Sequence, residues 1–430
     1  MTFNNTAPAT IAASYKRREK ICGFAIGVIA IVFSLAIMHG DTTLLDPSMR
    51  RFVAIPNYLA LLVLLYEVVS SPKDFRVYVP LLIVWVIQWI IDNFHLAPGV
   101  DMSIQWSTLI LIMLFCMMRE RVWHYGFRVY RLFLVFGSVF GIIAFVGFLT
   151  GLFPPLETVD YYNNSGGPGA VYQVYPFSYI MVGIEGIRLC GLFNEPGYLG
   201  TISALVLIAD GFNMRSLGNW LILIAAVFSF SIAFFLLIGI YWGARMLQSA
   251  KALLIVLSVV AVLLFVVVPH IPEDSLVGQL VVSRLTYDKD ENQLAGDSRT
   301  TDAFLVYWDK TIRDGRIFFG QGGGYFNNKD VGSLSYKKEI VQHGLFGCFL
   351  MWGLLVFACL KYKQRSLKWW LLIICFFASI YQRPSIFLYN YMIILFGGME
   401  NVRIIDSEKK KQLSTSTKKD ENSNLCVRPV

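Results

Sequence analysis

The chain has 430 residues, of which 56% are hydrophobic, 15% are aromatic and only 15% are charged. So few charges would not cover the surface of a soluble protein of this length, and the composition therefore predicts an integral membrane protein. The formal net charge of +8 does not indicate a nucleic acid partner, because the basic residues gather in short runs beside apolar segments and in the C-terminal tail.

The seven cysteines indicate neither a metal site nor a disulfide framework, because none has CxxC or other metal-type spacing. Most lie in apolar segments, where cysteine behaves as a small hydrophobic residue. The acidic run from Asp288 to Glu291 is better explained as a solvated turn than as a metal-binding carboxylate pair. The sequence also has no Ser-His-Asp elbow, phosphate-binding P-loop or zinc motif, so we expect no metal and no cofactor.

Apolar segments predict about twelve membrane-spanning helices, because about 20 residues at about 1.5 Å each cross a hydrocarbon layer of about 30 Å. The expected fold class is an all-α integral membrane protein. Breaks are predicted at Ser229–Ser231 and at Tyr381–Pro384, where a proline interrupts the helical hydrogen bonds. The predicted spans are residues 21–38, 52–70, 77–94, 104–118, 132–152, 198–214, 218–230, 231–247, 252–268, 341–360, 367–381 and 385–398.

Lysine and arginine in the connections predict the orientation of these spans, because cytoplasmic connections are enriched in both. All the main basic runs fall on one side, which we assign to the cytoplasm. Residues 1–20 and a polar, disordered tail at 399–430 would lie there as well. The two long polar segments, residues 153–197 and 269–340, would then lie outside, where we expect the chemistry. The basic runs are residues 16–20, 119–131 and 361–368.

The second outer segment is predicted to contain a helix over residues 302–314, with Thr300 as its N-cap and Gly315 as its stop. An aromatic helical face beside a bilayer favours a helix that lies along the membrane interface. Residues 320–324, rich in glycine, are expected to form a flexible turn leading back to the membrane. The expected face consists of Phe304, Tyr307, Trp308 and Ile312.

The segment RLCGLFNEPGYLGT, residues 188–201, places charged side chains at the start of the sixth predicted span. Pro196 suits the first turn of a helix, and the helix dipole favours the carboxylate of Glu195 near the N-cap. One interpretation is therefore structural: Asn194 and Glu195 cap the helix, and Arg188 binds lipid headgroups. Capping leaves the arginine unexplained, however, and an arginine and a carboxylate at the rim of a bundle indicate a functional site.

Further arginines are predicted on the same side. Arg383 stands between two short apolar helices, directly before Pro384, and a functional role is favoured there. Neighbouring Tyr381 could donate a hydrogen bond, although tyrosine is common at membrane interfaces. Three loop arginines suit a diphosphate, because a guanidinium can donate to two oxygens at once, although interleaved aspartates fit a solvated loop equally well. These are Arg299, Arg313 and Arg316.

His343 begins the tenth predicted span, in the stretch IVQHGLFG. A histidine there could act as a general base, because its ordinary pKa lies near neutral pH. The alternative, which we favour, is a histidine that only lies at the membrane interface.

These motifs resemble those of the O-antigen ligase and polymerase superfamily. Residues 188–199 resemble its signature R-x-x-G-x-F-x-E/N-P, and residues 339–348 resemble the motif e-x-G-l-l-G that begins a late span. Tyr381-Gln-Arg383-Pro384 resembles the final-hairpin motif of capsular and O-antigen polymerases (Wzy-type). Ser229-Phe-Ser231 and Gly320-Gln-Gly322 add weaker matches. The resemblance covers residues from about 180 to 400, and the first 150 match only as spans.

Within that superfamily, polymerase is favoured over ligase. Ligases carry a histidine in an H-N-x-x-L stretch about a dozen residues before the glycine of the late span. Here that register falls near Ser333, and His343 instead stands directly before Gly344. The short span that ends in Ser229-Phe-Ser231 also lacks the arginine that often follows the serine in ligases.

The resemblance implies a multi-pass glycosyltransferase of the bacterial cytoplasmic (inner) membrane that joins oligosaccharide repeat units linked to undecaprenyl diphosphate, making O-antigen, capsule or exopolysaccharide. Membrane lipid, a chain-length regulator and a flippase are the partners it suggests. Arg188, Arg299 and Arg383 would bind the diphosphate and stabilise the leaving group. Glu195 would orient or deprotonate the acceptor hydroxyl, or else hold Arg188. The further substrate-binding candidates are Arg313, Arg316, Asn194, Tyr381 and His343.

Two other functions remain open alongside a ligase. A flippase or other transporter would need a polar path deep within its spans and often has repeat symmetry, whereas these spans are largely apolar and show no internal repeat. A scaffold or polymer-length regulator without activity would not need Arg188, Glu195 and Arg383 at the rims of spans.

Overall fold

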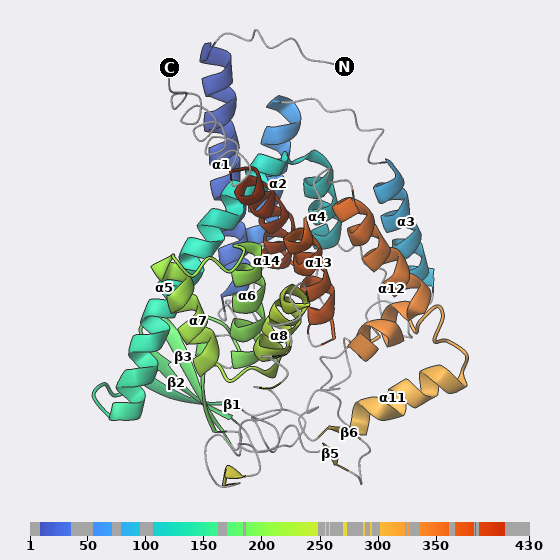
Figure 1. Ribbon diagram of the computed structural model, residues 1–430. Coiled ribbons are helices and arrows are strands. Elements are labelled where there is room, and N and C mark those ends of the chain that lie inside the picture. The colour runs from blue at the N-terminus through green and yellow to red at the C-terminus, as the bar shows by residue number, and fades with distance from the viewer. Residues whose placement is uncertain are drawn as a thin grey trace, which may run out of the picture.

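The computed structural model describes residues 9–35, 55–70, 79–94, 106–161, 170–183, 186–247, 302–322, 325–326, 336–360, 366–381, 383 and 387–408, with isolated positions between 254 and 294. The described chain is mostly helical, with one four-stranded sheet and a two-stranded one formed by β5 (Tyr287–Asp288) and β6 (Gln293–Leu294) (Figure 1). The first part holds α1 (Ala9–Ser34), α2 (Ile55–Ser70), α3 (Val79–Phe94), α4 (Trp106–Met117) and the long α5 (Glu120–Thr150).

Three short helices follow the sheet, and a second group ends the chain. The three are α6 (Pro196–Ala209), α7 (Leu217–Phe228) and α8 (Ile232–Met246). The second group is α11 (Asp302–Arg313), α12 (Tyr336–Leu360), α13 (Leu367–Ser379), α14 (Tyr389–Met392) and the π-helical turn η7 (Ile393–Gly397). Each predicted apolar segment that is described is helical, and both predicted breaks interrupt helices: α7 ends at Phe228, and α13 ends at Ser379. Most of the ninth predicted span, 252–268, lies outside the described residues.

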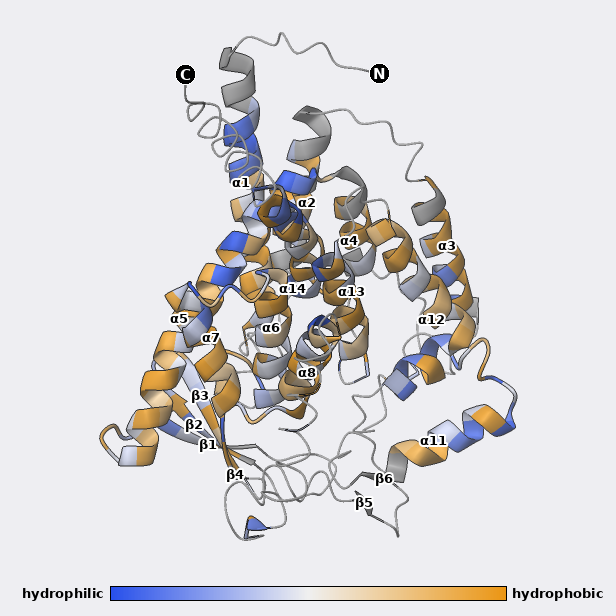
Figure 2. Ribbon diagram, viewed as in Figure 1, coloured by the Kyte–Doolittle hydropathy of each residue, from blue (hydrophilic) through white to orange (hydrophobic). Residues whose placement is uncertain are grey.

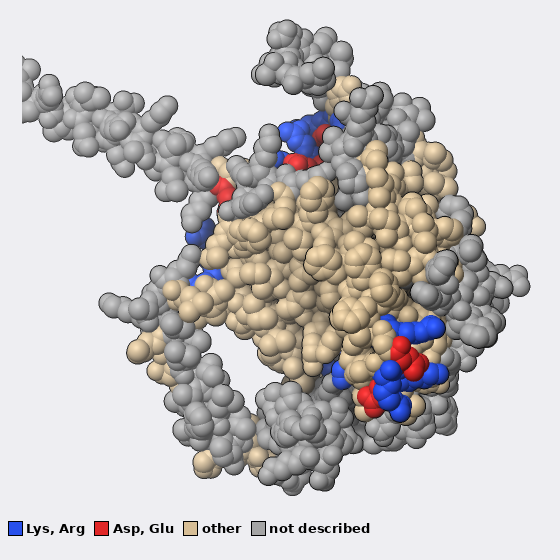
Figure 3. Space-filling view, turned by 90° about the vertical axis from the view of Figure 1, so that its right-hand side faces the viewer, with Lys and Arg blue, Asp and Glu red and all other residues tan. Residues whose placement is uncertain are grey.

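Two described helices, α5 and α12, are long and apolar enough to cross a membrane, and α6, α7, α8 and α13 are shorter apolar helices. Large apolar side chains on their surfaces face outward: Leu132 and Ile143 of α5 and Phe349 and Phe357 of α12 are exposed by 47% to 73%. Figure 2 shows hydrophobic residues along the helices of the middle of the molecule and hydrophilic ones in α11 and in part of α1. On the face in Figure 3, the described charged side chains gather towards two ends, with a wide uncharged band between them. Such apolar surface is typical of contact with lipid or another protein.

Helix α6 is the centre of the bundle. All of its residues from Pro196 to Ala209 are buried, as expected for a helix that is apolar on every side. It packs against α7, α8, α13 and strand β4. Gly200 allows one especially close approach, because a β-carbon there would lie 2.3 Å from Cβ of Ser231. The start of α6 is therefore held against the break between α7 and α8.

The expectation of an all-α fold is wrong for the first outer segment, which forms an antiparallel sheet in the order β1-β2-β3-β4. Its short runs are rich in Val, Ile and Tyr, which suit a half-buried pleated surface. Strands β3 and β4 pack on α5, where Gly137 and Gly141 leave room for Leu192 and Leu189. The strands are β1 (Glu157–Tyr161), β2 (Ala170–Tyr175), β3 (Ser178–Gly183) and β4 (Gly186–Gly191).

The second outer segment also differs in part from its prediction. Helix α11 ends before Gly315, which has a φ of 67°, whereas the expected N-cap Thr300 lies outside the described residues. Its aromatic face packs inward against Tyr325 and Phe326 rather than facing a bilayer. The predicted fourth member of the face, Ile312, is 46% exposed. The residue that is buried at this turn of the helix is Thr311.

The glycine-rich turn after α11 is ordered through Gly322. Helix α12 is kinked at Gly344, so the carbonyl oxygens of Val341 and Gln342 accept hydrogen bonds from the backbone N–H groups of Gln321 and Gly322, at 2.7 and 3.0 Å. The expected flexible turn is therefore wrong for residues 320–322, while 323 and 324 lie outside the described residues.

Residues 1–20 were predicted as a cytoplasmic N-terminus and 399–430 as a disordered cytoplasmic tail, and helix extends into both segments. Helix α1 already includes residues 9–20, and helical structure continues after η7 through Glu408. The part of the expected disordered tail from 399 to 408 is therefore helical, and 409–430 lie outside the described residues. Figure 1 shows the start of α1 and this C-terminal helix at one end of the molecule, and the sheet and α11 at the other.

Candidate functional site

Strand β4 leads directly into α6 through residues 191–195. Gly191 ends the strand with a φ of 61°, and Pro196 is the first residue of the helix. Glu195 occupies the N-cap with an extended backbone, but its side chain makes no capping hydrogen bond. The structural interpretation, in which this carboxylate caps the helix, is therefore wrong for its side chain, and the carboxylate is used elsewhere.

Glu195 forms an ion pair with Arg383. Nη1 of Arg383 meets Oε1 of Glu195, and the two side chains are 12% and 25% exposed. Arg383 follows α13 and is anchored by its backbone N–H, which donates to the carbonyl of Ser379 at 2.8 Å. Two predicted site residues distant in sequence are thus brought together, and the idea that Glu195 instead holds Arg188 is wrong.

Tyr198 lies beneath the same guanidinium. Glu195 and Tyr198 stand at i and i+3 around the first turn of α6, so their side chains share one side of the helix. The guanidinium carbon of Arg383 lies 5.4 Å from the centre of the Tyr198 ring, a cation–π distance. The Tyr198 hydroxyl accepts a hydrogen bond of 2.6 Å from Nδ2 of Asn390 in α14.

Arg188 is held by the break between α7 and α8. Its side chain lies on the face of β4 opposite Leu189, as strand alternation requires. Its Nε donates to the carbonyl of Ser229 at 3.1 Å and its Nη2 to that of Phe230 at 3.5 Å. Phe230 has a φ of 45°, and this backbone turn leaves carbonyls outside any helix. Arg188 is only 7% exposed, so it is no surface lipid contact in the described structure.

The electrostatics of the site depend on burial. Burial, with a smaller contribution from the charge of Arg188, lowers the pKa of Arg383 to about 10, so the guanidinium stays protonated at neutral pH. Nε and Nη2 of Arg383 are buried and have no hydrogen-bond partner among the described residues. Burial also raises the pKa of Cys190 in β4 to about 12, which makes this thiol a poor nucleophile. The arrangement can therefore donate hydrogen bonds to an anionic oxygen.

Two substrate-binding candidates lie beside this cluster. The backbone carbonyl of Asn194 accepts a hydrogen bond of 2.9 Å from the Tyr172 hydroxyl, which joins the sheet to the start of α6. Tyr381 is 56% exposed and stacks on Tyr336, the first residue of α12, with 5.4 Å between ring centres. The start of α12 is therefore close to the end of α13.

His343 joins α12 to α3 instead. Its Nδ1 lies 3.5 Å from Nε2 of Gln88, and its Nε2 lies 3.4 Å from Oε2 of Glu339. Gly347 makes this possible, because a β-carbon there would lie 2.8 Å from the Gln88 amide. Both ring nitrogens face polar groups of the protein, which is typical of a histidine that fastens two helices.

Two of the loop arginines, Arg313 and Arg316, do not join the cluster. Arg313 is exposed and, among the described residues, donates to the carbonyl of Asp309 within its own helix, at 3.4 Å. Arg316 is exposed and donates to Oε1 of Gln321 at 3.4 Å. For these two the solvated loop is the better explanation, and Arg299 lies outside the described residues. No group of three or more His, Cys, Asp and Glu among the described residues is arranged to hold a metal.

The sequence prediction missed Tyr198 and Asn390. Tyr198 belongs to the segment singled out from the sequence, and its i+3 relation to Glu195 was a usable signal. For Asn390 the available signal was a polar amide within the apolar stretch YNYMIILF. A side chain in such a stretch is expected to be buried, as Asn390 is, and a buried amide needs a hydrogen-bond partner.

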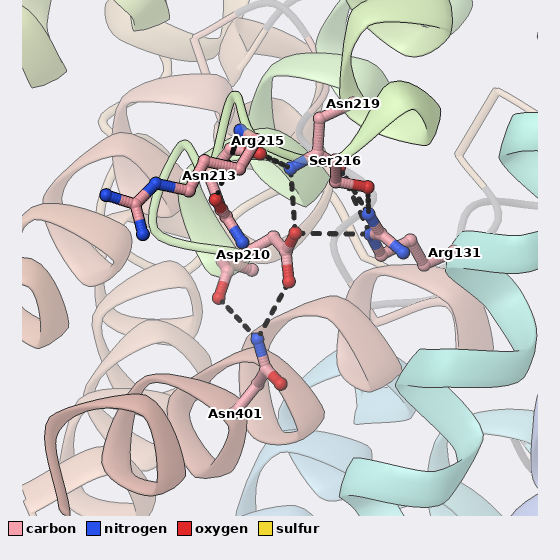
Figure 4. A network of polar contacts seen from close by, with 8 residues as sticks. Arg131, Asp210, Asn213, Arg215, Ser216, Asn219 and Asn401 are labelled. Carbon is pink, nitrogen blue, oxygen red and sulfur yellow. Dashed lines mark hydrogen bonds and ion pairs between the residues drawn. The ribbon is translucent and has the colours of Figure 1, made fainter. Parts of the chain in front are cut away.

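A second polar network, also missed, lies where α6 ends and α7 begins (Figure 4). Arg131 of α5 pairs with Asp210 at 3.3 Å and donates to Oδ1 of Asn219 at 2.6 Å. Asn219 in turn donates to Oδ2 of Asp210 at 2.8 Å, and Asn401 donates to Oδ1 at 3.2 Å. Ser216 accepts a further hydrogen bond from Arg131 at 2.9 Å. Because both carboxylate oxygens of Asp210 have partners, this network joins α5, α6, α7 and the C-terminal helix.

Comparison with protein-family models, curated proteins and solved structures gives no match for this chain.

Proposed function

We propose that the chain is a multi-pass membrane glycosyltransferase, a polysaccharide polymerase that joins undecaprenyl-diphosphate-linked oligosaccharides at the outer face of the bacterial inner membrane. The observation that carries the proposal is the cluster of Arg188, Glu195 and Arg383. Two sequence motifs far apart in the chain meet in it: the segment 188–199 contributes Arg188 and Glu195, and the segment 381–384 contributes Arg383. The resemblance of those motifs to the O-antigen ligase and polymerase superfamily supplies the reaction class.

The surface of the molecule supports a membrane location. Apolar side chains are exposed along α5 and α12, and charged groups on one face gather at two ends. In the proposed topology of about twelve spans, the sheet and α11 lie outside and both termini lie in the cytoplasm. The arginine cluster stands at the outer ends of α6 and α13, at the level where a lipid diphosphate would be presented.

The chemistry suits the cluster. In the proposed reaction the acceptor hydroxyl oxygen attacks the anomeric carbon of the donor sugar, and the bond from that carbon to the diphosphate oxygen breaks. Negative charge develops on the departing diphosphate, which the guanidinium groups of Arg383 and Arg188 would stabilise. The acceptor hydroxyl loses its proton, which the carboxylate of Glu195, paired with Arg383 in the cluster, would accept. Arg299, in the second outer loop, stays a candidate for the same diphosphate.

The deciding experiment uses purified protein and a synthetic undecaprenyl-diphosphate-linked repeat unit. A ladder of products with new glycosidic bonds and release of undecaprenyl diphosphate is expected. Transfer of glycan to a lipid A-core acceptor alone would identify a ligase instead. Movement of the lipid-linked unit across liposomes without new bonds would identify a flippase, and either result would overturn the polymerase proposal. If a ladder forms, co-purification of the protein with a chain-length regulator from native membranes would test that proposed partner.

A further inference from the structure

The guanidinium of Arg383 lies on a ring that is itself held in place. The Tyr198 ring is 4% exposed and contacts Phe193 edge to face, with 5.3 Å between ring centres. Tyr391 packs on it from α14, at 6.2 Å. These neighbours limit the movement of the ring. Because the guanidinium of Arg383 lies against the face of the ring, its movement is limited as well.

The hydroxyl of Tyr198 adds a directional restraint that apolar packing would not give. A phenylalanine would fill nearly the same volume, whereas a buried hydroxyl and a buried amide are costly unless they pair. Here they pair with each other across two elements, since Asn390 is fully buried and donates to the hydroxyl at 2.6 Å. Tilting the ring would break this hydrogen bond in a place where water does not replace it.

The two polar residues also tie together the two segments that meet in the ion pair. Tyr198 and Glu195 belong to the first turn of α6, while Asn390 belongs to the segment that follows Arg383. The start of α6 thus contributes Glu195 to the ion pair and Tyr198 to the hydrogen bond, and the later segment contributes Arg383 and Asn390. The ion pair fixes Nη1 alone, so a second contact is needed to set the plane of the guanidinium and the direction of Nε and Nη2.

We propose that Tyr198 and Asn390 are positioning residues that set the plane of the Arg383 guanidinium, so that Nη1 meets Glu195 while Nε and Nη2 point towards the diphosphate of the donor. This role rests on the proposed polymerase function for the identity of the ligand. The restraint on Arg383 itself is independent of that function and is tested separately.

The first test is kinetic, on purified protein with the synthetic lipid-linked repeat unit. Tyr198→Phe and Asn390→Leu are expected to lower kcat by about tenfold to a hundredfold, as small misplacements of a charge-stabilising group do, with KM changed by less than about threefold. The double variant should lose no more than the worse single variant, because both changes break the same hydrogen bond. Tyr241→Phe and Asn219→Leu are matched controls: both side chains are fully buried, but they contact Arg245 and Arg131 respectively. These controls should keep kcat per folded molecule.

The second test needs no substrate. Phenylglyoxal labels accessible arginine side chains, and mass spectrometry gives the labelling rate of Arg383 in folded protein. Tyr198→Leu, which removes the ring, and Asn390→Leu should each raise that rate at least severalfold, whereas the two controls should leave it at the wild-type value. Size-exclusion chromatography and Tm confirm that each variant is folded.

The two tests separate the possible failures. If wild-type protein makes no polymer while Arg383 labelling rises as expected, the proposed function fails and the positioning role stands. The positioning role is wrong if wild-type protein is active, Tyr198→Phe and Asn390→Leu keep kcat, and Tyr198→Leu and Asn390→Leu keep the slow labelling of Arg383. A rise in KM with unchanged kcat would also overturn it, because it would indicate a binding contact rather than orientation of a charge in the transition state.

Discussion

Gly320 and Gly344 meet backbone to backbone, and neither position has room for a side chain. A β-carbon on Gly320 would lie 2.3 Å from the carbonyl oxygen of Gln342, and one on Gly344 would lie 2.3 Å from that of Phe318. Both residues have a positive φ, of 77° and 70°. The kink of α12 and the turn after α11 are thus a single joint, which fastens α11 to the long apolar α12.

We expect Gly320→Ala and Gly344→Ala to destabilise this joint. The left-handed backbone alone costs about 1–2 kcal/mol for a residue with a β-carbon, and the clash with a backbone carbonyl adds to that. Tm in detergent should fall, and limited proteolysis should cut near α11 more quickly.

Gly315→Ala is the matched control for the joint, because Gly315 also has a positive φ, of 67°, but has open space around its α-carbon. It should show the cost of the backbone conformation without that of the clash. Equal loss of Tm in all three variants would contradict a tight joint at Gly320 and Gly344.

Removing either charge of the Glu195–Arg383 pair should abolish most activity. Arg383→Ala deletes a buried donor to the leaving group, and such losses cost about a hundredfold to a thousandfold in rate. Glu195→Gln keeps the size of the side chain but removes its charge, and it should also slow polymer formation. The measurement is the initial rate of ladder formation at equal amounts of folded protein. Wild-type polymer length and rate in both variants would refute the assignment.

Asp210→Ala should lower stability more than activity. Arg131 and Asp210 are 23% and 17% exposed, and removing one partner of a largely buried pair costs about 3 kcal/mol or more. The expected result is a lower Tm with normal activity per folded molecule, because the network lies at the opposite end of α6 from Glu195. Asp309→Ala, on the exposed side of α11, provides a surface control that should leave Tm unchanged. A Tm as high in Asp210→Ala as in that control would show the network to be dispensable.

Cys190 should resist alkylation in the folded protein. Its side chain is fully buried, and burial raises the pKa of the thiol to about 12, so very little reactive thiolate forms at pH 8. N-ethylmaleimide should leave Cys190 unlabelled between pH 7 and 9 and label it fully after denaturation in detergent and urea. Labelling of native protein at the rate of a free thiol would mean that β4 opens readily.

Much of the helical architecture could be predicted from hydrophobicity alone, because each apolar run needs its backbone hydrogen bonds satisfied internally. The breaks at Ser229–Ser231 and Tyr381–Pro384 were visible as polar residues and a proline within such runs. The sheet was not predicted, since its strands are short and gain stability from one another and from α5. Alternation in AVYQVY and SYIMVG, with Pro176-Phe177 as a turn between them, was the available signal.

The site shows a similar limit. Charge and chemistry identified Arg188, Glu195 and Arg383 one by one, but the sequence does not say which carboxylate meets which guanidinium. That choice depends on how α13 packs against α6, a contact between segments nearly two hundred residues apart. His343 divides in the same way: Glu339 stands four residues earlier in its own helix, a contact that spacing alone could predict, whereas the contact with Gln88 depends on how α3 packs against α12.

The pairing of Glu195 with Arg383 also has a consequence for biosynthesis. Arg383 is translated 188 residues after Glu195 (383 minus 195). Until then the carboxylate at the start of α6 lacks the guanidinium that follows α13, so no partly made chain holds the complete ion pair. If the cluster has the proposed function, a chain truncated before Arg383 would therefore be inert towards lipid-linked sugars.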